Sequence, residues 1–229
     1  MRLRAPSSLY TWKVLEPYVL KAQQRLEIGP GTLPKFEVKG THFLDTSESA
    51  IRKLEQRGGK GLVGNAEESL PFNDNTFNLI GIFEVLEHLA QPEKTIREIA
   101  RVLKDSGIFI FSVPIRQKYW SKWDEFAGHV QRFEPEQLEK MLTKEGFFIE
   151  HCYTDLHQTK YTFALLRYGY SICCPILSRF PEFFSNFFFI PYALIAKKFT
   201  RIRHYSSLND ISPNSANLIA VCKKLKTSQ

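Results

Sequence analysis

The strongest constraint on the fold is an alternation of short apolar runs with helix-like segments between residues 25 and 152. Each run has the length of a β-strand and is followed by a turn signal or by a segment with helical periodicity. This alternation is typical of a mostly parallel sheet covered by helices, so we expect an α/β, doubly wound fold. The expected strands are Arg25–Ile28, His42–Leu44, Gly61–Val63, Asn78–Phe83, Gly107–Val113 and Phe147–Tyr153.

Helical periodicity appears in three segments that follow these runs. Ser47–Arg57 opens with a small polar residue and then spaces its apolar residues as an exposed amphipathic helix does. Glu93–Leu103 repeats that pattern, and Pro135–Lys144 has its proline in the first turn. Near the end of the chain, Asn217–Lys224 is apolar and β-branched and predicts a late antiparallel strand at the edge of the sheet.

The length of 229 residues favours one domain built around one core. Within this single domain, we expect an N-terminal helical cap at residues 1–24 and a core at 25–153. An aromatic and basic segment at 154–214 is expected to form a helical insertion or substrate cap, and residues 215–225 the last strand.

Composition and cysteine usage are those of an ordinary globular chain. Hydrophobic residues make up 43% and charged residues 24%, and the first residues lack an apolar run of signal-peptide length, so we expect a cytoplasmic protein. No CxxC pair occurs among Cys152, Cys173, Cys174 and Cys222, and His151 is best explained as an ordinary strand residue. We therefore expect reduced, structural cysteines and no metal ion.

The net charge of +7 arises entirely in the last third of the chain. Residues 151–229 hold 10 lysines and arginines against three acidic residues. Residues 175–205 interleave these cations with phenylalanines, a pattern that fits an interfacial helix pair on an anionic membrane surface. A helical cap over a substrate pocket, a dimer interface or a solvated basic face explains the pattern equally well, and the sequence sets no oligomeric state. Because no nucleic-acid-binding motif occurs, we expect no nucleic-acid partner.

A glycine turn directly after the first strand carries the first functional signal. In Glu27–Thr32, two glycines let backbone amides approach a ligand closely. The dinucleotide fingerprint requires a third glycine where Pro34 stands, so a nicotinamide enzyme is not expected. Asp45 ends the second strand 18 positions after Glu27, near the interval at which a carboxylate binds ribose hydroxyls. The alternative is that Asp45 caps the helix beginning near Ser47.

Six ordered blocks give the chain a wider resemblance. They are LEIGPGT, FLDTSESAI, GNAEESLPFNDNTFNLI, FEVLEHL, REIARVLKDSG with IFIFSVP, and GHVQRFEPEQLEKMLTKEGF. Together they cover roughly Leu26 to Phe148, and in order and spacing they resemble the class I S-adenosylmethionine-dependent methyltransferases, particularly the type 11 branch. The resemblance implies a Rossmann-like fold, S-adenosylmethionine as cofactor and a small-molecule acceptor.

The resemblance also implies roles for individual residues. The expected cofactor-binding residues lie at the carboxyl ends of the first four strands: Glu27, Gly29, Pro30, Gly31, Asp45, Thr46, Asn65, Ala66, Phe83 and Glu84. Ligands of open α/β sheets bind at that edge. The expected substrate side holds Tyr119, Trp120, Trp123 and His129, with packing of the three aromatic rings in the core as the alternative.

Because the sulfonium of this cofactor already carries an activated methyl group, the protein has mainly to align the acceptor and remove a proton where one is lost. His88 is the candidate base, with packing beneath the cofactor as the alternative. Glu84 and Glu87, three residues apart, read as a solvated face rather than a catalytic pair.

The predicted function is methyl transfer to a small acceptor, hydrophobic or lipid-linked. The alternative is a non-catalytic S-adenosylmethionine-binding or membrane-associated module. That alternative rests on Leu33, where the family commonly has a third glycine, and on Asn65, where it commonly has Asp.

Overall fold

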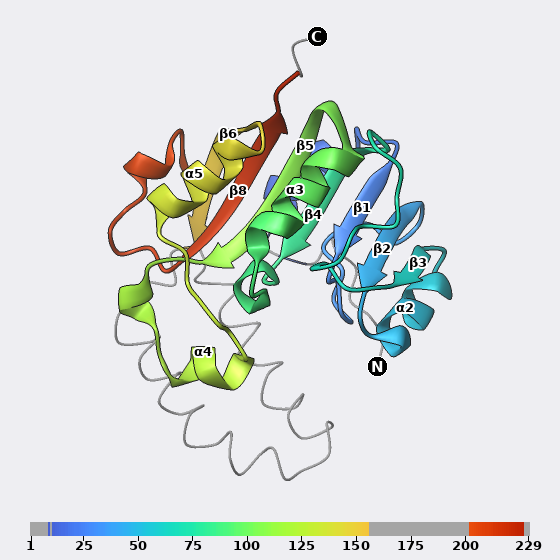
Figure 1. Cartoon of the computed structure of the whole chain (residues 1–229), viewed down its shortest axis with the longest axis horizontal. Helices are drawn as coiled ribbons and strands as arrows, with labels where there is room; N and C mark the ends of the chain where they lie inside the picture. Colours follow the sequence, from blue (N-terminus) through green and yellow to red (C-terminus); the bar gives the residue numbers. More distant parts are fainter. Residues whose placement is uncertain (1–8, 10, 156–201, 227–229) are drawn as a thin grey trace.

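The structure is a computed structural model that describes residues 9, 11–155 and 202–226 (Figure 1). The described part is built on one eight-stranded sheet with the order β3-β2-β1-β4-β5-β8-β6-β7. The strands are β1 (Arg25–Ile28), β2 (Thr41–Asp45), β3 (Lys60–Val63), β4 (Phe77–Phe83), β5 (Leu103–Pro114), β6 (Phe147–Asp155), β7 (Ile202–Tyr205) and β8 (Asn217–Lys224). The helices are α1 (Trp12–Val19), α2 (Glu48–Glu55), α3 (Pro92–Val102), α4 (Lys122–Ala127) and α5 (Pro135–Lys144). Short 3-10 turns occupy Leu86–His88, Gln117–Tyr119 and Leu208–Asp210.

The first five strands run parallel to one another, as the alternation of apolar runs predicts. β1 lies between β2 and β4, and the chain proceeds outward from β1 to β3 in one direction and from β4 to β5 in the other. The strand order therefore changes direction between β1 and β4. Ligands of open α/β sheets bind beside such a point, at the carboxyl ends of the strands.

The positions of β7 and β8 differ from the prediction for the sheet edge. Asn217–Lys224 forms an antiparallel strand as expected, but it lies inside the sheet between β5 and β6. Five consecutive residues of β8, from Leu218 to Cys222, are buried, as in a strand covered on both faces. The antiparallel edge strand is instead β7, at the end of the segment predicted to be a helical insertion. Most of that segment, residues 156–201 with the phenylalanine-rich stretch, lies outside the described residues.

Helices cover both faces of the sheet (Figure 1). On one face α3 and α5 pack their buried stripes, which include Ile96, Ile99, Leu138 and Leu142, against apolar residues of the central strands. On the other face α1 packs with residues such as Leu79 and Ile110. The helix α1 falls inside the N-terminal cap expected at 1–24, of which residues 1–8 and 10 lie outside the described residues. No helix of the described residues combines the length and the apolarity that crossing a membrane requires.

The connection from β1 to β2 is a loop, residues 29–40, rather than a helix. Its buried residue Phe36 fills the space beside the sheet and meets the ring of Phe83 edge-on, with 5.7 Å between ring centroids. A Cβ atom at Gly81 would lie 2.5 Å from the Phe36 ring, so glycine in β4 is what lets this loop pack so closely. The glycine turn can therefore present backbone amides to a ligand, but no helix N-terminus, with its partial positive charge, follows the turn.

Two of the four cysteines lie in the described residues, and both are buried in the sheet. Cys152 and Cys222 are free thiols. Burial raises the pKa of the Cys152 thiol to about 12, so its reactive thiolate form is disfavoured. These two cysteines are structural, as predicted, whereas Cys173 and Cys174 lie outside the described residues.

Candidate functional site

The glycine turn after β1 needs its two glycines for different reasons. Gly29 and Gly31 both have positive φ, at 67° and 52°. A Cβ atom at Gly29 would lie 2.5 Å from Cγ2 of Val85, whereas a Cβ at Gly31 would meet nothing within 4 Å. Gly29 is therefore packed against the β4 end, while Gly31 borders open space in which a ligand can approach the backbone.

Asp45, the last residue of β2, links the turn after β1 to the residues that follow β2. One carboxylate oxygen accepts a hydrogen bond from the Gly31 amide at 2.8 Å, and the other accepts one from the Ser47 amide, also at 2.8 Å. The N-cap of α2 is Ser47, whose hydroxyl accepts from the Ala50 amide, so the alternative reading of Asp45 as the cap is wrong. The carboxylate of Asp45 instead lies beside the open side of the glycine turn.

Glu27 stabilises the loop between β1 and β2 through hydrogen bonds to its backbone. Its side chain is buried, and its two oxygens accept hydrogen bonds from the amides of Lys35 and Phe36, each at 2.8 Å. Burial raises the pKa of Glu27 to about 7, although the two amide bonds act in the opposite direction. Both carboxylate oxygens are thus used inside the loop, and we infer that Glu27 positions the cofactor loop.

Replacing Glu27 with glutamine should lower the free energy of unfolding by about 1–3 kcal/mol at pH 8, where the wild-type carboxylate is charged. The reason is that a glutamine can accept from only one of the two amides, and its NH₂ group then faces the other N–H. Urea unfolding measures the change. Glu37→Gln, at an exposed position of the same loop, is the control and should change it by less than about 0.5 kcal/mol. Equal stabilities for the two variants would contradict this account of the loop.

The segment after β4 has a constrained backbone. Glu84 is exposed and has a positive φ of 54°, a conformation that non-glycine residues seldom adopt. The hydroxyl of Ser112, at the end of β5, donates to the Glu84 carboxylate at 2.6 Å, and the Glu84 amide donates to the Ser112 carbonyl. Phe83 is buried against Phe36, so its ring packs beside the site rather than lining it openly.

The remaining predicted cofactor residues lie at the same edge of the sheet. Pro30 is buried in the turn, and Thr46 is exposed directly after Asp45. Asn65 follows β3, and its side-chain oxygen accepts from the Glu67 amide in a local turn. Ala66 is buried, and its carbonyl accepts from the Thr95 hydroxyl at 2.8 Å.

His88 and His129, 41 residues apart in the sequence, lie against each other. Their ring centroids are 4.8 Å apart, in an edge-on arrangement. Nδ1 of His88 bonds to the Gly128 carbonyl at 3.0 Å, and the Val130 amide donates to the Glu87 carbonyl. The loop after α4 is thus fastened to the turn after β4. The candidate base and the predicted substrate-side histidine belong to one cluster.

The structure also adds residues that the sequence interpretation missed. Glu87 is fully buried, which corrects its reading as part of a solvated face. Asp124 is buried too, and it bonds to Nδ1 of His129 at 3.0 Å and to Nε of Arg132 at 2.7 Å. Burial raises the pKa of Glu87 to about 9, and the nearby Glu84 adds to that rise. The available signal for burial of Glu87 was its place in a short turn with Leu86 before it and Leu89 two residues after it.

The predicted aromatic walls lie on and around α4, beyond the carboxyl edge of the strands (Figure 1). Tyr119 is half-buried, and its hydroxyl donates to the Pro213 carbonyl at 3.1 Å. Trp120 is half-buried, whereas Trp123 is exposed and lies beside the exposed Phe126. Of these rings, Trp123 and Phe126 form an apolar surface.

A family model described as a methyltransferase domain, of type 11, matches residues 26–111. This part of the chain therefore matches a type 11 methyltransferase domain, as the resemblance predicts. An uncharacterised protein of Methanocaldococcus jannaschii is 32% identical over 132 residues, 53% of this chain and 63% of that protein. The ubiquinone/menaquinone biosynthesis C-methyltransferase UbiE of Escherichia fergusonii is 34% identical over 96 residues, 38% of each chain. The chain therefore spans less than two thirds of the length of either relative.

Solved structures show the same fold. A solved S-adenosylmethionine-dependent methyltransferase of Thermotoga maritima superposes with a TM-score of 0.60 at 18% identity, covering 96% of this chain and 95% of that one. The predicted fold class is therefore confirmed, and the match over residues 26–111 supports the predicted methyltransferase family and its cofactor, S-adenosylmethionine. The described residues also fit the cofactor this family uses, because Gly31 borders open space and the Asp45 carboxylate lies directly beside it.

Proposed function

We propose that this protein transfers the methyl group of S-adenosylmethionine to a small, hydrophobic or lipid-linked acceptor. The observation that carries the proposal is the pairing of the Gly31 amide with the Asp45 carboxylate, next to open space at the point where the strand order changes direction. A nucleoside with a polar tail is the ligand class that such a turn and carboxylate suit.

In this proposal, the cofactor lies along the carboxyl ends of β1 to β4. Gly29, Pro30 and Gly31 would face its amino-acid part, and Asp45 with Thr46 its ribose. Asn65 and Ala66 would face its adenine, and the turn at Glu84 its sulfonium. A carboxylate with remaining lone pairs suits two vicinal hydroxyls, because each hydroxyl can donate one bond to it.

The acceptor is proposed to approach from the side of His88, His129 and α4. When bound, the cofactor supplies an electrophilic methyl group, so the protein's task is alignment and exclusion of water. An acceptor that loses a proton needs a base, and His88 is our candidate because it is exposed next to the Glu84 turn. Its Nδ1 bonds to the Gly128 carbonyl, which fixes that nitrogen as the N–H and leaves Nε2 as the acceptor.

The hydrophobic character of the acceptor is supported by exposed apolar side chains near this side. Trp123, Phe126 and Val130 are 39%, 59% and 58% exposed, on α4 and the loop after it. The ring centroids of Trp123 and Phe126 lie 5.8 Å apart, and neighbouring exposed apolar groups mark a binding surface more often than isolated ones do. The name of the UbiE relative, a quinone-biosynthesis methyltransferase, agrees with an apolar acceptor.

Peripheral contact with an anionic membrane is part of the same proposal. It rests on the basic excess of residues 151–229. Co-sedimentation with vesicles containing anionic lipid, compared with neutral vesicles, should show binding only to the former. Absence of binding to both kinds would remove the membrane contact and leave methyl transfer untouched.

Turnover tests the function itself. The protein is incubated with methyl-labelled S-adenosylmethionine and a panel of phenols, quinols, amines and lipid-linked acceptors, and label in the organic phase is measured. We expect transfer to at least one apolar acceptor, reduced at least about tenfold in His88→Ala if the acceptor loses a proton. Tight cofactor binding without turnover on any acceptor would favour a non-catalytic binding module instead.

A further inference from the structure

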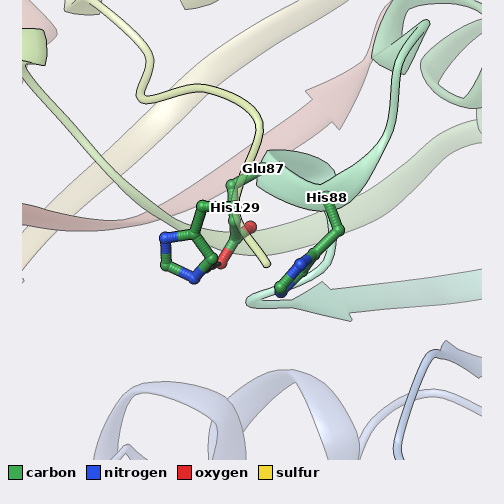
Figure 2. Close-up of side chains that lie close together, drawn as sticks. All are labelled: Glu87, His88 and His129. Carbon is green, nitrogen blue, oxygen red and sulfur yellow. Dashed lines mark ion pairs between the residues drawn. The ribbon is translucent and has the colours of Figure 1, made fainter. Parts of the chain in front are cut away.

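Three potential metal ligands converge beside the substrate side of the candidate site. Glu87 and His88 come from the 3-10 turn after β4, and His129 comes from the loop after α4. One ligand atom from each lies within 4.8 Å of the other two. In the view of Figure 2, the carboxylate of Glu87 lies between the two imidazole rings.

The carboxylate of Glu87 lacks a hydrogen-bond partner among the described residues. Its side chain is 0% exposed, and neither Oε1 nor Oε2 has such a bond. The ring nitrogen Nε2 of His129 is 3.8 Å from Oε1, too far for a hydrogen bond but close enough for both atoms to bind one ion. A buried, unpaired carboxylate is strongly unfavourable, so a proton or a cation is needed at this position.

Both histidines are oriented so that one nitrogen is available as a ligand. Nδ1 of His88 bonds to the Gly128 carbonyl, and Nδ1 of His129 bonds to the Asp124 carboxylate, each at 3.0 Å. In each ring the N–H is therefore on Nδ1, and Nε2 carries the lone pair. A histidine that donates its other N–H to a carboxylate is the usual support for a metal ligand, because the bond fixes the ring and increases its basicity.

The nearest buried guanidinium is already paired. Arg132 donates to Asp124 at 2.7 Å and has only 7% of its side chain exposed. Asp124 and Arg132 therefore neutralise each other, and Glu87 remains as the uncompensated acid of this group.

We propose that Glu87, His88 and His129 bind a divalent transition-metal ion, with Zn²⁺ as the best-matched one. Two imidazoles and one carboxylate are a donor set of zinc sites that keep a fourth position open. Ligand atoms around a tetrahedral zinc ion are about 3.3 Å apart, given zinc–ligand bonds near 2.0–2.1 Å. The exposed His88 side chain can rotate to close the present separation of up to 4.8 Å.

The proposal does not depend on methyl transfer, since Zn²⁺ binding is measured in the absence of S-adenosylmethionine. It departs from the sequence prediction of no metal ion, which considered only the cysteines and His151. In a metal-loaded protein His88 is a ligand and not a base. The open position of the ion then offers a binding place to an oxygen or nitrogen of the acceptor.

The test is a calorimetric titration of the untagged, chelator-treated full chain with Zn²⁺, with Co²⁺ as a spectroscopic probe. We expect one equivalent of Zn²⁺ to bind with a dissociation constant below about 1 μM, and Co²⁺ to show the visible absorption of a four-coordinate site. Glu87→Gln and His88→Gln should each weaken Zn²⁺ binding by at least about tenfold. His88 is exposed, so His88→Gln tests the site even if a change at the buried Glu87 disturbs folding.

His151→Gln is the matched control, because His151 belongs to a second exposed histidine pair, 3.0 Å from His204 across β6 and β7. The variant should bind Zn²⁺ with unchanged affinity. The proposal is overturned if the wild-type chain binds no Zn²⁺. It is also overturned if binding survives in both Glu87→Gln and His88→Gln, or is lost in His151→Gln. In those cases a proton, rather than a cation, satisfies Glu87.

Discussion

Replacing Asp45 with alanine is expected to weaken the binding of S-adenosylmethionine by about 100-fold, equivalent to about 2.7 kcal/mol. The variant loses two contributions at once. The proposed bonds from ribose hydroxyls to a carboxylate are charge-assisted, and each is worth about 1.5–3 kcal/mol. The bond between Asp45 and the Gly31 amide, which holds the glycine turn in place, is lost as well.

Calorimetric titration of the wild type and the variant measures this change. Glu48→Ala is the control, since Glu48 is an exposed carboxylate three residues further along the chain. Its ion pair with Arg52 is exposed and should have little effect. Asp45→Asn should also bind weakly, because an amide has one acceptor oxygen for the two amides that Asp45 now serves. An affinity of Asp45→Ala within about threefold of the wild type would refute the assigned role.

The substitutions Gly29→Ala and Gly31→Ala are expected to impair the protein in different ways, the first through stability and the second through cofactor binding. Gly29→Ala should lower the free energy of unfolding by about 2–4 kcal/mol, because a left-handed backbone conformation and overpacking against Val85 add together. Gly31→Ala has the same backbone cost, about 1–2 kcal/mol, but no steric conflict within the protein. Its methyl group would instead occupy the open space assigned to the cofactor.

The two variants are compared by urea unfolding and by S-adenosylmethionine titration. Gly31→Ala should remain folded and lose at least about tenfold in cofactor affinity, whereas Gly29→Ala should lose stability first. Gly40→Ala is a useful reference for the backbone cost alone, since Gly40 has a φ of 77° in the same loop and a Cβ atom there would meet only an arginine side chain, at 3.5 Å. Unchanged cofactor affinity in Gly31→Ala would mean that the cofactor does not bind against this turn.

The local parts of the fold were predictable because each depends on neighbours in the sequence. The strand Arg25–Ile28 and the helix Pro135–Lys144 occur with the predicted bounds. The place of Asn217–Lys224 inside the sheet was not predictable in the same way. An apolar strand covered on both faces and an edge strand can share one short sequence pattern, and only pairing with β5 and β6 distinguishes them.

The same distinction, between local sequence and contacts with distant residues, applies to the site. The glycine turn and Asp45 were identified from spacing within one strand–loop–strand unit. The environment of Glu87 depends on Asp124 in α4 and on His129 in the loop after it, 37 and 42 residues further along the chain, and no local pattern encodes that proximity. Asp45 and Glu27 were both predicted to bind the cofactor. In the structure, Asp45 lies beside open space, whereas Glu27 is enclosed in the loop.

The central claim is that the carboxyl edge of this sheet binds S-adenosylmethionine, and calorimetric titration of the purified chain tests it most directly. We predict binding of one equivalent of S-adenosylmethionine or of its demethylated product, and no binding of NAD. Heat of binding for NAD, or none for either form of the methyl donor, would contradict the account.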